Sequence, residues 1–349
     1  VVQSRGLESW LTLELARRLG VWGNPSFPFP RHLVEQVLEV LDPESTEQAL
    51  AYDRDRLRWT LASILSDTPP EELRDYLADD PDRILRFAGN VASVFDDYVV
   101  YRPDLLSDWT SGKRDGWESE LWRALVTKLG PHDLASRMSR ALGRLRQGDA
   151  ELDLTRLHLF SLETLPPQFL RFFGELSKRV PTTLYVLEPS RQYLDDTGGA
   201  RQLALPLEGG ARDGHPFLIG TGRLARDFQQ ILSDADSLLE RQYELFEEPG
   251  RDSLLRSLQA DVLDFEPEPP SEERRQLPRS DRSISIHACT GPMREVQVLH
   301  DLVRDALERD PTLKPEDVVV MAPDLDTYAP IFRAVFGEHS NHRIPFDVH

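Results

Sequence analysis

Hydrophobic residues recur at helical spacing from about residue 31 to residue 148 of the chain. Apolar side chains three and four positions apart form one stripe along a helix, which favours amphipathic helices that pack against a core. The clearest stripes are Leu33, Val34, Val37, Leu38 and Leu41, then Leu57, Leu61, Ile64 and Leu65, then Leu85, Ala88, Val91, Val94, Phe95 and Tyr98. No strand-like alternation of useful length interrupts them, so the pattern predicts an all-helical segment of about four or five helices.

A different pattern precedes this segment. Val1 and Val2 indicate the end of a buried strand, and residues 3–7 form a loop before a helix expected from about residue 8 to residue 19. Pro25, Pro28 and Pro30 then interrupt regular structure, because proline lacks a backbone donor and restricts the residue before it. The start of the chain is therefore predicted to be a strand–loop–helix unit.

Strand signals return after residue 152. The apolar runs 157–160 and 182–187 are rich in strand formers, and residues 167–179 between them have helical spacing. Strand, helix and strand in this order predict a parallel βαβ unit. A glycine-rich loop at about 198–210 and a helix at about 222–232 are expected to follow.

Residues 265–282 are rich in proline and charge, which predicts a flexible linker. Beyond it, residues 283–289 alternate as a strand does, residues 294–308 have helical spacing, and residues 318–322 form a buried-strand signal. A last helix is expected at about 328–336, ending at Gly337. We therefore predict an α/β protein: a first domain of residues 1–40 and 151–264, a helical insertion at 41–150, a linker at 265–282, and the start of a second α/β domain at 283–349.

Composition narrows the class of protein. The 40% hydrophobic and 29% charged residues are ordinary for a soluble globular chain, and no apolar run is long enough to span a membrane. One cysteine, Cys289, excludes an internal disulfide framework and a cysteine-rich zinc site, so we expect a cytoplasmic protein. The net charge of −19 argues against a free-standing DNA-coating protein, although a channel lined locally by arginine remains compatible with it.

The first loop has the position of a nucleotide phosphate cradle but lacks its chemistry. Such a loop needs flanking glycines followed by Gly-Lys-Ser/Thr, whereas residues 3–8 read Gln-Ser-Arg-Gly-Leu-Glu. Glu163, after the 157–160 strand, is the candidate for a magnesium-binding acid, but it stands alone and an ordinary surface role fits it better. No metalloprotease, serine-hydrolase or zinc spacing occurs. We expect no cofactor, no metal site and no catalytic residue.

Several blocks of sequence carry a family resemblance. They are residues 2–11 (Val-Gln-Ser-Arg-Gly-Leu-Glu-Ser-Trp-Leu), 27–30 (Phe-Pro-Phe-Pro), 95–104 (Phe-Asp-Asp-Tyr-Val-Val-Tyr-Arg-Pro-Asp), 121–126, 226–228, 291–301, 310–313 and 334–337. Together they resemble the N-terminal portion of the RecC family, the gamma subunits of exodeoxyribonuclease V in the RecBCD complex. The resemblance runs from the first residues of the chain to the last.

The resemblance implies a superfamily 1 helicase-like fold with dead ATP sites. RecC-like subunits act with RecB-like and RecD-like partners on double-strand DNA ends for recombinational repair. They channel the separated strands and scan single-stranded DNA for a hot-spot sequence. The resemblance also implies that this segment has no intrinsic activity. It would act only as part of an ATP-dependent helicase and nuclease complex that is not bound to a membrane. Since the chain starts without Met and stops within an element, we expect the remainder of a longer protein on either side.

Three residues match family positions that line the hot-spot scanning channel. Gln3 and Asp96 have side chains that can read base edges, and Arg102 can contact a phosphate or stack on a base. Helix-surface and helix-capping roles are the alternatives for Asp96 and Arg102. Neighbouring positions depart from the family pattern, which does not support recognition of the same hot-spot sequence. The departing residues are Arg5, Ser9, Phe29, Glu35, Ser93 and Asp97.

The acidic composition leaves a second function class open. A protein-interaction scaffold that makes no DNA contact of its own would also account for a net charge of −19. An active helicase or nuclease would require functional residues outside this sequence.

Overall fold

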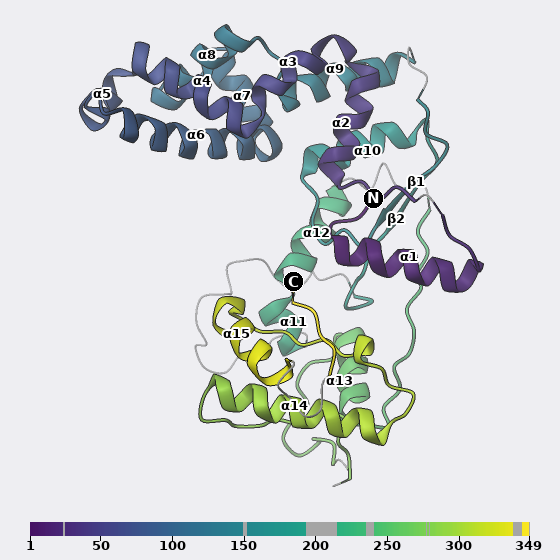
Figure 1. Cartoon of the computed structure of the whole chain (residues 1–349). Helices are drawn as coiled ribbons and strands as arrows, with labels where there is room; N and C mark the ends of the chain where they lie inside the picture. Colours follow the sequence, from purple (N-terminus) through teal and green to yellow (C-terminus); the bar gives the residue numbers. More distant parts are fainter. Residues whose placement is uncertain are drawn as a thin grey trace. The chain divides into compact units, whose positions relative to one another are not determined.

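The computed structural model describes residues 1–23, 25–148, 152–192, 215–234, 241–276, 278, 280–337 and 344–348. Two compact units divide the chain: Val1–Gly250 with Ser257–Arg274, and Arg251–Arg256 with Arg275–His349. The described residues are mostly helical, with one small parallel sheet (Figure 1). The predicted α/β class is therefore confirmed only in part.

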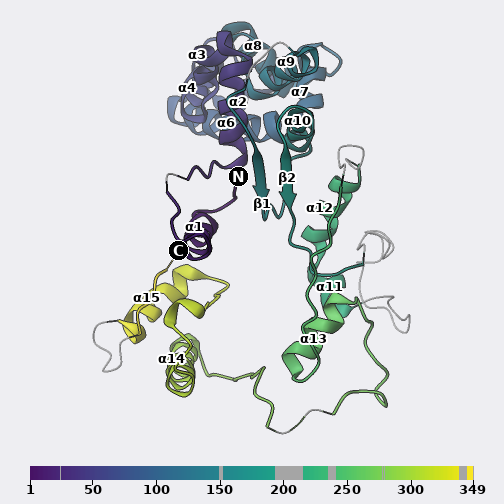
Figure 2. The same cartoon turned by 90° about the vertical axis from the view of Figure 1, so that its right-hand side faces the viewer.

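The sheet pairs β1 (Leu157–Phe160) with β2 (Thr182–Tyr185) in parallel, with Leu157 opposite Thr182. Figure 2 shows the two strands side by side. Helix α10 (Pro167–Ser177) makes the crossover between them, as two parallel strands require. Its apolar face is buried through Phe169, Leu170, Phe172, Phe173 and Leu176. The βαβ unit predicted from the sequence is confirmed.

The N-terminal segment lies along β1. The backbone N–H of Phe160 donates to the carbonyl of Val1 at 3.0 Å, and the Val1 nitrogen donates to the carbonyl of His158 at 2.7 Å. The backbone N–H of Val2 donates to Pro28 at 3.3 Å. Residues 1–2 are thus buried beside the sheet as expected, but the pairing is too short to count as a strand. Helix α1 (Arg5–Leu19) follows and begins three residues earlier than the spacing predicted.

Residues 30–147 form the helical segment that the hydrophobic stripes predicted. Its helices are α2 (Pro30–Leu41), α3 (Thr46–Ala49), α4 (Arg54–Asp67), α5 (Glu71–Leu77), α6 (Pro81–Tyr101), α7 (Pro103–Thr110), α8 (Trp117–Leu129) and α9 (Leu134–Gln147), with single 3-10 turns at Pro43–Ser45 and Leu50–Tyr52. Proline opens α2, α6 and α7, where its missing donor costs nothing. These breaks explain why the helices are more numerous than the stripes suggested.

Aromatic rings fill the centre of this helical segment. The rings of Phe95 and Trp122 meet edge to face with centroids 5.3 Å apart, and Trp109 packs 6.0 Å from Phe95. The indole N–H of Trp122 donates to the hydroxyl of Thr110 at 3.0 Å, so burial leaves this donor satisfied. The core continues into the sheet through α10, and one cluster of buried apolar residues spans both.

Helices α11 (Pro216–Thr221), α12 (Arg223–Asp234) and α13 (Leu254–Leu263) come after the sheet. The helix expected at 222–232 is confirmed as α12. The side chain of Ser190 and the backbone N–H of Arg191 both donate to the carbonyl of Leu263, each at 3.0 Å, which fixes the segment after β2 to the end of α13. The glycine-rich loop expected at 198–210 lies outside the described residues.

The second unit contains α14 (Pro292–Arg309), α15 (Leu325–Phe336) and a 3-10 turn at Pro315–Asp317. Its buried core consists of Val296, Val303, Phe336 and Ile344. Both helices confirm predictions, but the strands expected at 283–289 and 318–322 do not form among the described residues. Ile286, Val319 and Met321 are exposed there, and the described residues of the unit offer neither segment a neighbouring strand. The second βαβ unit is therefore a wrong prediction.

Candidate functional site

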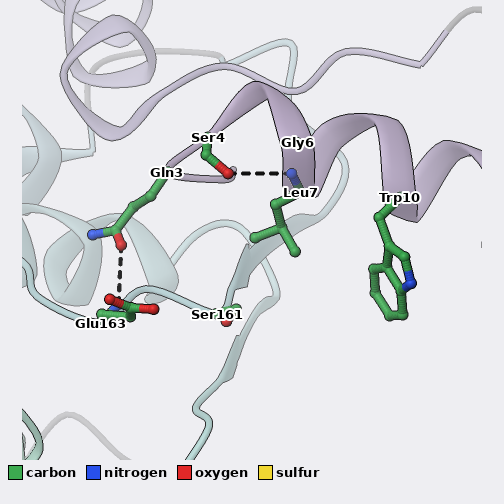
Figure 3. A pocket seen from close by; sticks show the side chains of 7 residues that line it. All are labelled: Gln3, Ser4, Gly6, Leu7, Trp10, Ser161 and Glu163. Atoms are coloured by element: carbon green, nitrogen blue, oxygen red, sulfur yellow. Dashed lines mark hydrogen bonds between the residues drawn. The ribbon is translucent and has the colours of Figure 1, made fainter. Parts of the chain in front are cut away.

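A pocket of 480 Å³ lies at the start of α1. Gln3, Ser4, Gly6, Leu7 and Trp10 line it from one side, and Ser161 and Glu163 line it from the segment after β1 (Figure 3). This is the carboxyl end of a parallel strand facing a helix N-terminus, a place where open α/β folds commonly bind ligands. The loop singled out in the sequence therefore borders this open pocket.

Ser4 precedes α1, and its hydroxyl caps the start of the helix. Its backbone is extended, and its hydroxyl accepts a hydrogen bond from the backbone N–H of Leu7 at 3.2 Å. This is an N-cap, which satisfies one of the donors that a helix leaves unpaired at its start. The helix ends at Gly20, whose φ of 80° needs a residue without a Cβ.

The side chain of Gln3 joins the two sides of the pocket. Its Nε2 donates to the carbonyl of Thr164 at 2.5 Å, and its Oε1 accepts from the backbone N–H of Glu163 at 3.0 Å. In Figure 3, Gln3 and Glu163 lie on one side of Leu7, and Trp10 lies on the opposite side of Leu7. Both ends of the amide are used within the chain, so Gln3 fixes the position of the residue 163–164 backbone.

Ser161 turns the chain at the end of β1. Its φ of 49° lies in the left-handed region, an uncommon conformation for a residue with a side chain. Its backbone N–H donates to the carbonyl of Tyr185 at 3.0 Å, which ties this turn to β2. The turn brings Glu163 to the pocket, and among the described residues the Glu163 carboxylate has no hydrogen-bond or ion-pair partner.

The pocket is unsuited to a nucleotide triphosphate. Its lining contains one charged side chain, and that side chain is the acidic Glu163. No lysine is present to neutralise phosphates, and the one hydroxyl beside the helix start caps the helix. In the part of the chain that the structure describes, no group of three or more His, Cys, Asp or Glu side chains could hold a metal ion.

Asp96 lies on α6 and is held by an arginine of α2. Two nitrogens of Arg31 donate to the two oxygens of Asp96 at 3.0 and 2.8 Å, and the Arg31 Nε donates to Glu35 at 3.1 Å. The hydrogen bond to Asp96 raises the pKa of Arg31 above its ordinary value. Arginine in the first turn of a helix opposes the helix dipole, so the two carboxylates offset an unfavourable position.

Arg102 stands where α6 ends and α7 begins. Its backbone N–H donates to Tyr98 at 2.9 Å and its carbonyl accepts from Leu106 at 3.3 Å, so its backbone serves both helices. Its side chain is exposed and makes no hydrogen bond or ion pair with any residue that the structure describes. Of the three residues chosen from the sequence, Arg102 is the one whose side chain has no hydrogen-bond or ion-pair partner among the described residues.

Gln168 fixes this corner, although sequence reasoning overlooked it. Its Nε2 donates to the carbonyls of Val99 and Val100 at 2.7 and 2.6 Å, which connects the start of α10 to the end of α6. Asp96 and Arg102 therefore share one helix end, whereas Gln3 belongs to the pocket beside α1. No hydrogen bond or ion pair among the described residues joins the three side chains to one another. The sequence analysis did not select Arg31 either. The one sequence feature that could have indicated it is a basic residue in the first turn of a helix.

A second pocket has a structural explanation. It is lined by Leu145, Arg146, Glu175, Lys178 and Arg179, at the ends of α9 and α10. Glu175 pairs with Arg146 at 3.2 Å and with Lys178 at 3.0 Å. The Nε of Arg179 donates to the carbonyl of Leu145 at 2.8 Å. Basic side chains at helix C-termini donate hydrogen bonds to the free carbonyls and interact favourably with the helix dipole. These two interactions account for the cluster.

Comparison with known proteins gives a consistent result. A family model described as "RecC, N-terminal domain" matches residues 1–265. The chain is 31% identical to the RecBCD enzyme subunit RecC of Escherichia coli K12, over 97% of the chain and 35% of that protein. The same-named proteins of Mycobacterium tuberculosis H37Rv and Haemophilus influenzae are 32% and 27% identical, over 97% and 100% of the chain. The chain spans about a third of the length of these relatives. None of the helices described here has the length and apolar content to cross a bilayer.

Proposed function

This chain belongs to the RecC family, and we propose that it is a catalytically empty, helicase-like part of a complex that processes DNA ends. In this proposal it channels separated strands and scans single-stranded DNA without hydrolysing ATP. RecB-like and RecD-like subunits are the proposed partners, since the relatives are named as subunits of the RecBCD enzyme. Double-strand DNA ends are the proposed substrate, and recombinational repair in the cytoplasm is the proposed setting.

The observation that carries the proposal is the pocket beside α1. It has the position of a phosphate cradle, between a helix N-terminus and the end of a parallel strand, yet its lining includes no lysine and its charge is acidic. The fold keeps the position of a phosphate cradle but lacks the residues that bind a nucleotide. This combination fits a subunit that does not hydrolyse ATP and has a different role. The helicase-like architecture, with residues 41–150 as its insertion and residues 283–349 as the start of a second domain, is part of the proposal.

The proposed DNA contacts are Arg102, Asp96 and Gln3. Arg102 is exposed and unpaired among the described residues, so it is suited to a phosphate contact. Asp96 would read a base edge only after Arg31 exchanges its carboxylate partner for another anion, such as a DNA phosphate. Gln3 would act through the amide hydrogen and lone pair that its two hydrogen bonds leave free.

The test is single-stranded DNA binding by the chain with Arg102→Ala. Loss of one phosphate contact should weaken binding roughly tenfold and lower the salt slope of log K by about one. Arg56→Ala is the matched control, because Arg56 is also exposed, on α4, and its side chain has no partner among the described residues. Equal, small effects of both substitutions would contradict a DNA role for Arg102.

A protein-interaction scaffold without direct DNA readout is the second candidate. The net charge of −19 favours it, and so does the engagement of Gln3 and Asp96 within the chain. In that case Arg102→Ala would leave DNA binding and hot-spot scanning by the assembled complex unchanged, which separates the two functions.

A further inference from the structure

Residues 241–250, which precede α13, form a largely exposed segment without regular structure. They contain no helix, strand, turn or bend, and no backbone hydrogen bond joins them to any other residue that the structure describes. Within the segment, Tyr243 is 74% exposed and Leu245 is 84% exposed. Two large apolar side chains so close together, on a backbone whose donors and acceptors are free, are typical of a segment that binds a partner.

One side of the segment is held by Arg191, which follows β2. The Nη2 of Arg191 donates to the Glu248 carboxylate at 2.5 Å, and the guanidinium lies over the Phe246 ring at 5.9 Å from its centroid. The hydrogen bond to Glu248 and the negative charge of nearby Glu244 both raise the pKa of Arg191. Residues 244, 246 and 248 therefore lie on the side of the segment that faces Arg191.

Arg191 is itself fixed in place. Its backbone N–H donates to the carbonyl of Leu263 at 3.0 Å, and its Nη1 donates to the Asp264 carboxylate at 3.3 Å, just beyond the end of α13. The segment is thus held against a rigid support. Holding a binding segment in place lowers the conformational cost of ordering it when a partner binds.

The positions of the side chains alternate as those of a β-strand do. In an extended chain, residues that differ by two share a face and neighbouring residues point to opposite faces. The even-numbered positions face Arg191, whereas Tyr243 and Leu245 share the opposite, exposed face. The backbone N–H and C=O groups point to the two edges, where no described residue pairs with them. A strand with free edges and an apolar face is a template for pairing with another strand.

We propose that residues 241–248 pair, as a β-strand, with the edge strand of a β-sheet in another subunit of the complex. The proposal rests on the proposed function, which supplies such subunits, and it adds an interface to that function. Backbone hydrogen bonds provide the affinity in this mode of recognition, and alternate side chains provide the specificity.

The outer face of the segment defines the chemistry of the partner strand. Arg241 and Glu247 flank the apolar pair of Tyr243 and Leu245 on this face. The partner strand should therefore present apolar side chains opposite the pair, an acidic side chain opposite Arg241 and a basic one opposite Glu247. A second copy of this chain is a poor partner, because each copy carries a net charge of −19.

Hydrogen exchange followed by mass spectrometry tests the backbone pairing. In the chain alone, the amides of residues 241–248 should exchange at nearly the unprotected rate. In the assembled complex with RecB-like and RecD-like subunits, they should exchange at least about tenfold more slowly. Slow exchange in the chain alone, or unchanged exchange in the complex, would overturn the proposal. Protection that appears when the chain alone is concentrated would assign the segment to a second copy and would also overturn it.

Two proline substitutions test whether one edge of the segment is used. Glu244→Pro and Glu247→Pro each remove one backbone N–H, and the two N–H groups point to opposite edges of an extended chain. One substitution should raise the Kd for the partner subunit about tenfold through the lost hydrogen bond, and the other should leave it within about threefold. Equal effects of the two substitutions would contradict strand pairing.

A substitution of the apolar pair separates this interface from the DNA function. Leu245→Ser should weaken association with the partner subunit about tenfold, whereas Leu50→Ser, at a 52% exposed leucine outside the segment, should not. Circular dichroism checks that each variant folds. If Leu245→Ser assembles normally while Arg102→Ala weakens DNA binding, the interface proposal fails and the DNA-channel proposal stands. If Leu245→Ser weakens assembly while Arg102→Ala leaves DNA binding unchanged, the interface stands and the DNA role of Arg102 fails.

Discussion

At the scale of single residues, Asp96 and Arg31 depend on each other. Arg31 lies in the first turn of α2, where its charge opposes the helix dipole, and Asp96 lies on α6 more than one turn before its end. Their two-pronged hydrogen bond offsets the unfavourable position of Arg31 and fastens the start of α2 to α6. A ligand that takes Asp96 must therefore also satisfy Arg31.

A double-mutant cycle measures this dependence. Arg31→Met and Asp96→Asn should each lower the free energy of unfolding, and the double variant should lose less than the sum, with a coupling of about 1 kcal/mol for a partly exposed, two-pronged pair. Urea denaturation monitored by fluorescence provides the values. Strictly additive losses would show that the pair contributes nothing to stability.

His215 provides a pH-dependent residue. It is buried before α11, and burial lowers its pKa, while Asp261 opposes part of that shift. A histidine with a lowered pKa resists protonation in the folded state, so its contribution is complete above the unfolded pKa of about 6.5. That contribution is lost as the pH falls through the lower folded value.

The prediction compares His215→Asn with the unmodified chain. Between about pH 7.5 and about pH 5.5, the unmodified chain should lose more unfolding free energy than the variant, which lacks the titrating group. Urea denaturation at several pH values checks this. A parallel decline in both proteins would assign the pH dependence to other groups.

At the scale of elements, α1 is a helix without buried residues, so its N-cap matters locally. Ser4→Ala should destabilise the first turn by about 1 kcal/mol and speed amide exchange at residues 5–8, whereas Ser4→Asp keeps a capping oxygen and should leave exchange nearly unchanged. Hydrogen exchange followed by mass spectrometry reports the effect. Unchanged exchange in Ser4→Ala would mean that the Leu7 hydrogen bond does not hold the turn.

At this scale, some of the strand predictions are correct and others are wrong. Runs 157–160 and 182–187 form β1 and β2 because they pair with each other, although β2 ends at Tyr185. Run 283–289 alternates and run 318–322 is continuously apolar, but the described residues of their unit give neither run a paired strand. Alternation indicates which face of a strand is apolar, whereas only a neighbouring strand supplies hydrogen-bond partners for its backbone N–H and C=O groups.

At the scale of the whole molecule, the two units have very different cores. The first has an extended core of buried apolar residues, whereas the second has four such residues around α14 and α15 in the part that the structure describes. All six tryptophans belong to the first unit, so tryptophan fluorescence reports on that unit alone. Circular dichroism reports on the helices of both.

We therefore expect urea to unfold the second unit first, with a circular dichroism transition that precedes the fluorescence transition. Phe336→Ala removes a buried ring and should cost the second unit about 3 kcal/mol, or unfold it, without moving the fluorescence transition. Leu61→Ala, at a fully buried position of α4, should move the fluorescence transition instead. Coincident transitions that shift together in both variants would mean that the units unfold as one.

The sequence by itself determined the local features: the helices at 30–147, the βαβ unit, and the loop without a phosphate-binding lysine. These follow from spacings of two to four residues and from residue identity, which need no knowledge of distant partners. The tertiary structure alone decided how the candidate residues are used. It placed Gln3 against residues 163–164, Arg31 against Asp96, and Gln168 against the end of α6. Such pairings join positions far apart in the chain, and they form only where packing brings two elements together, which no local period encodes.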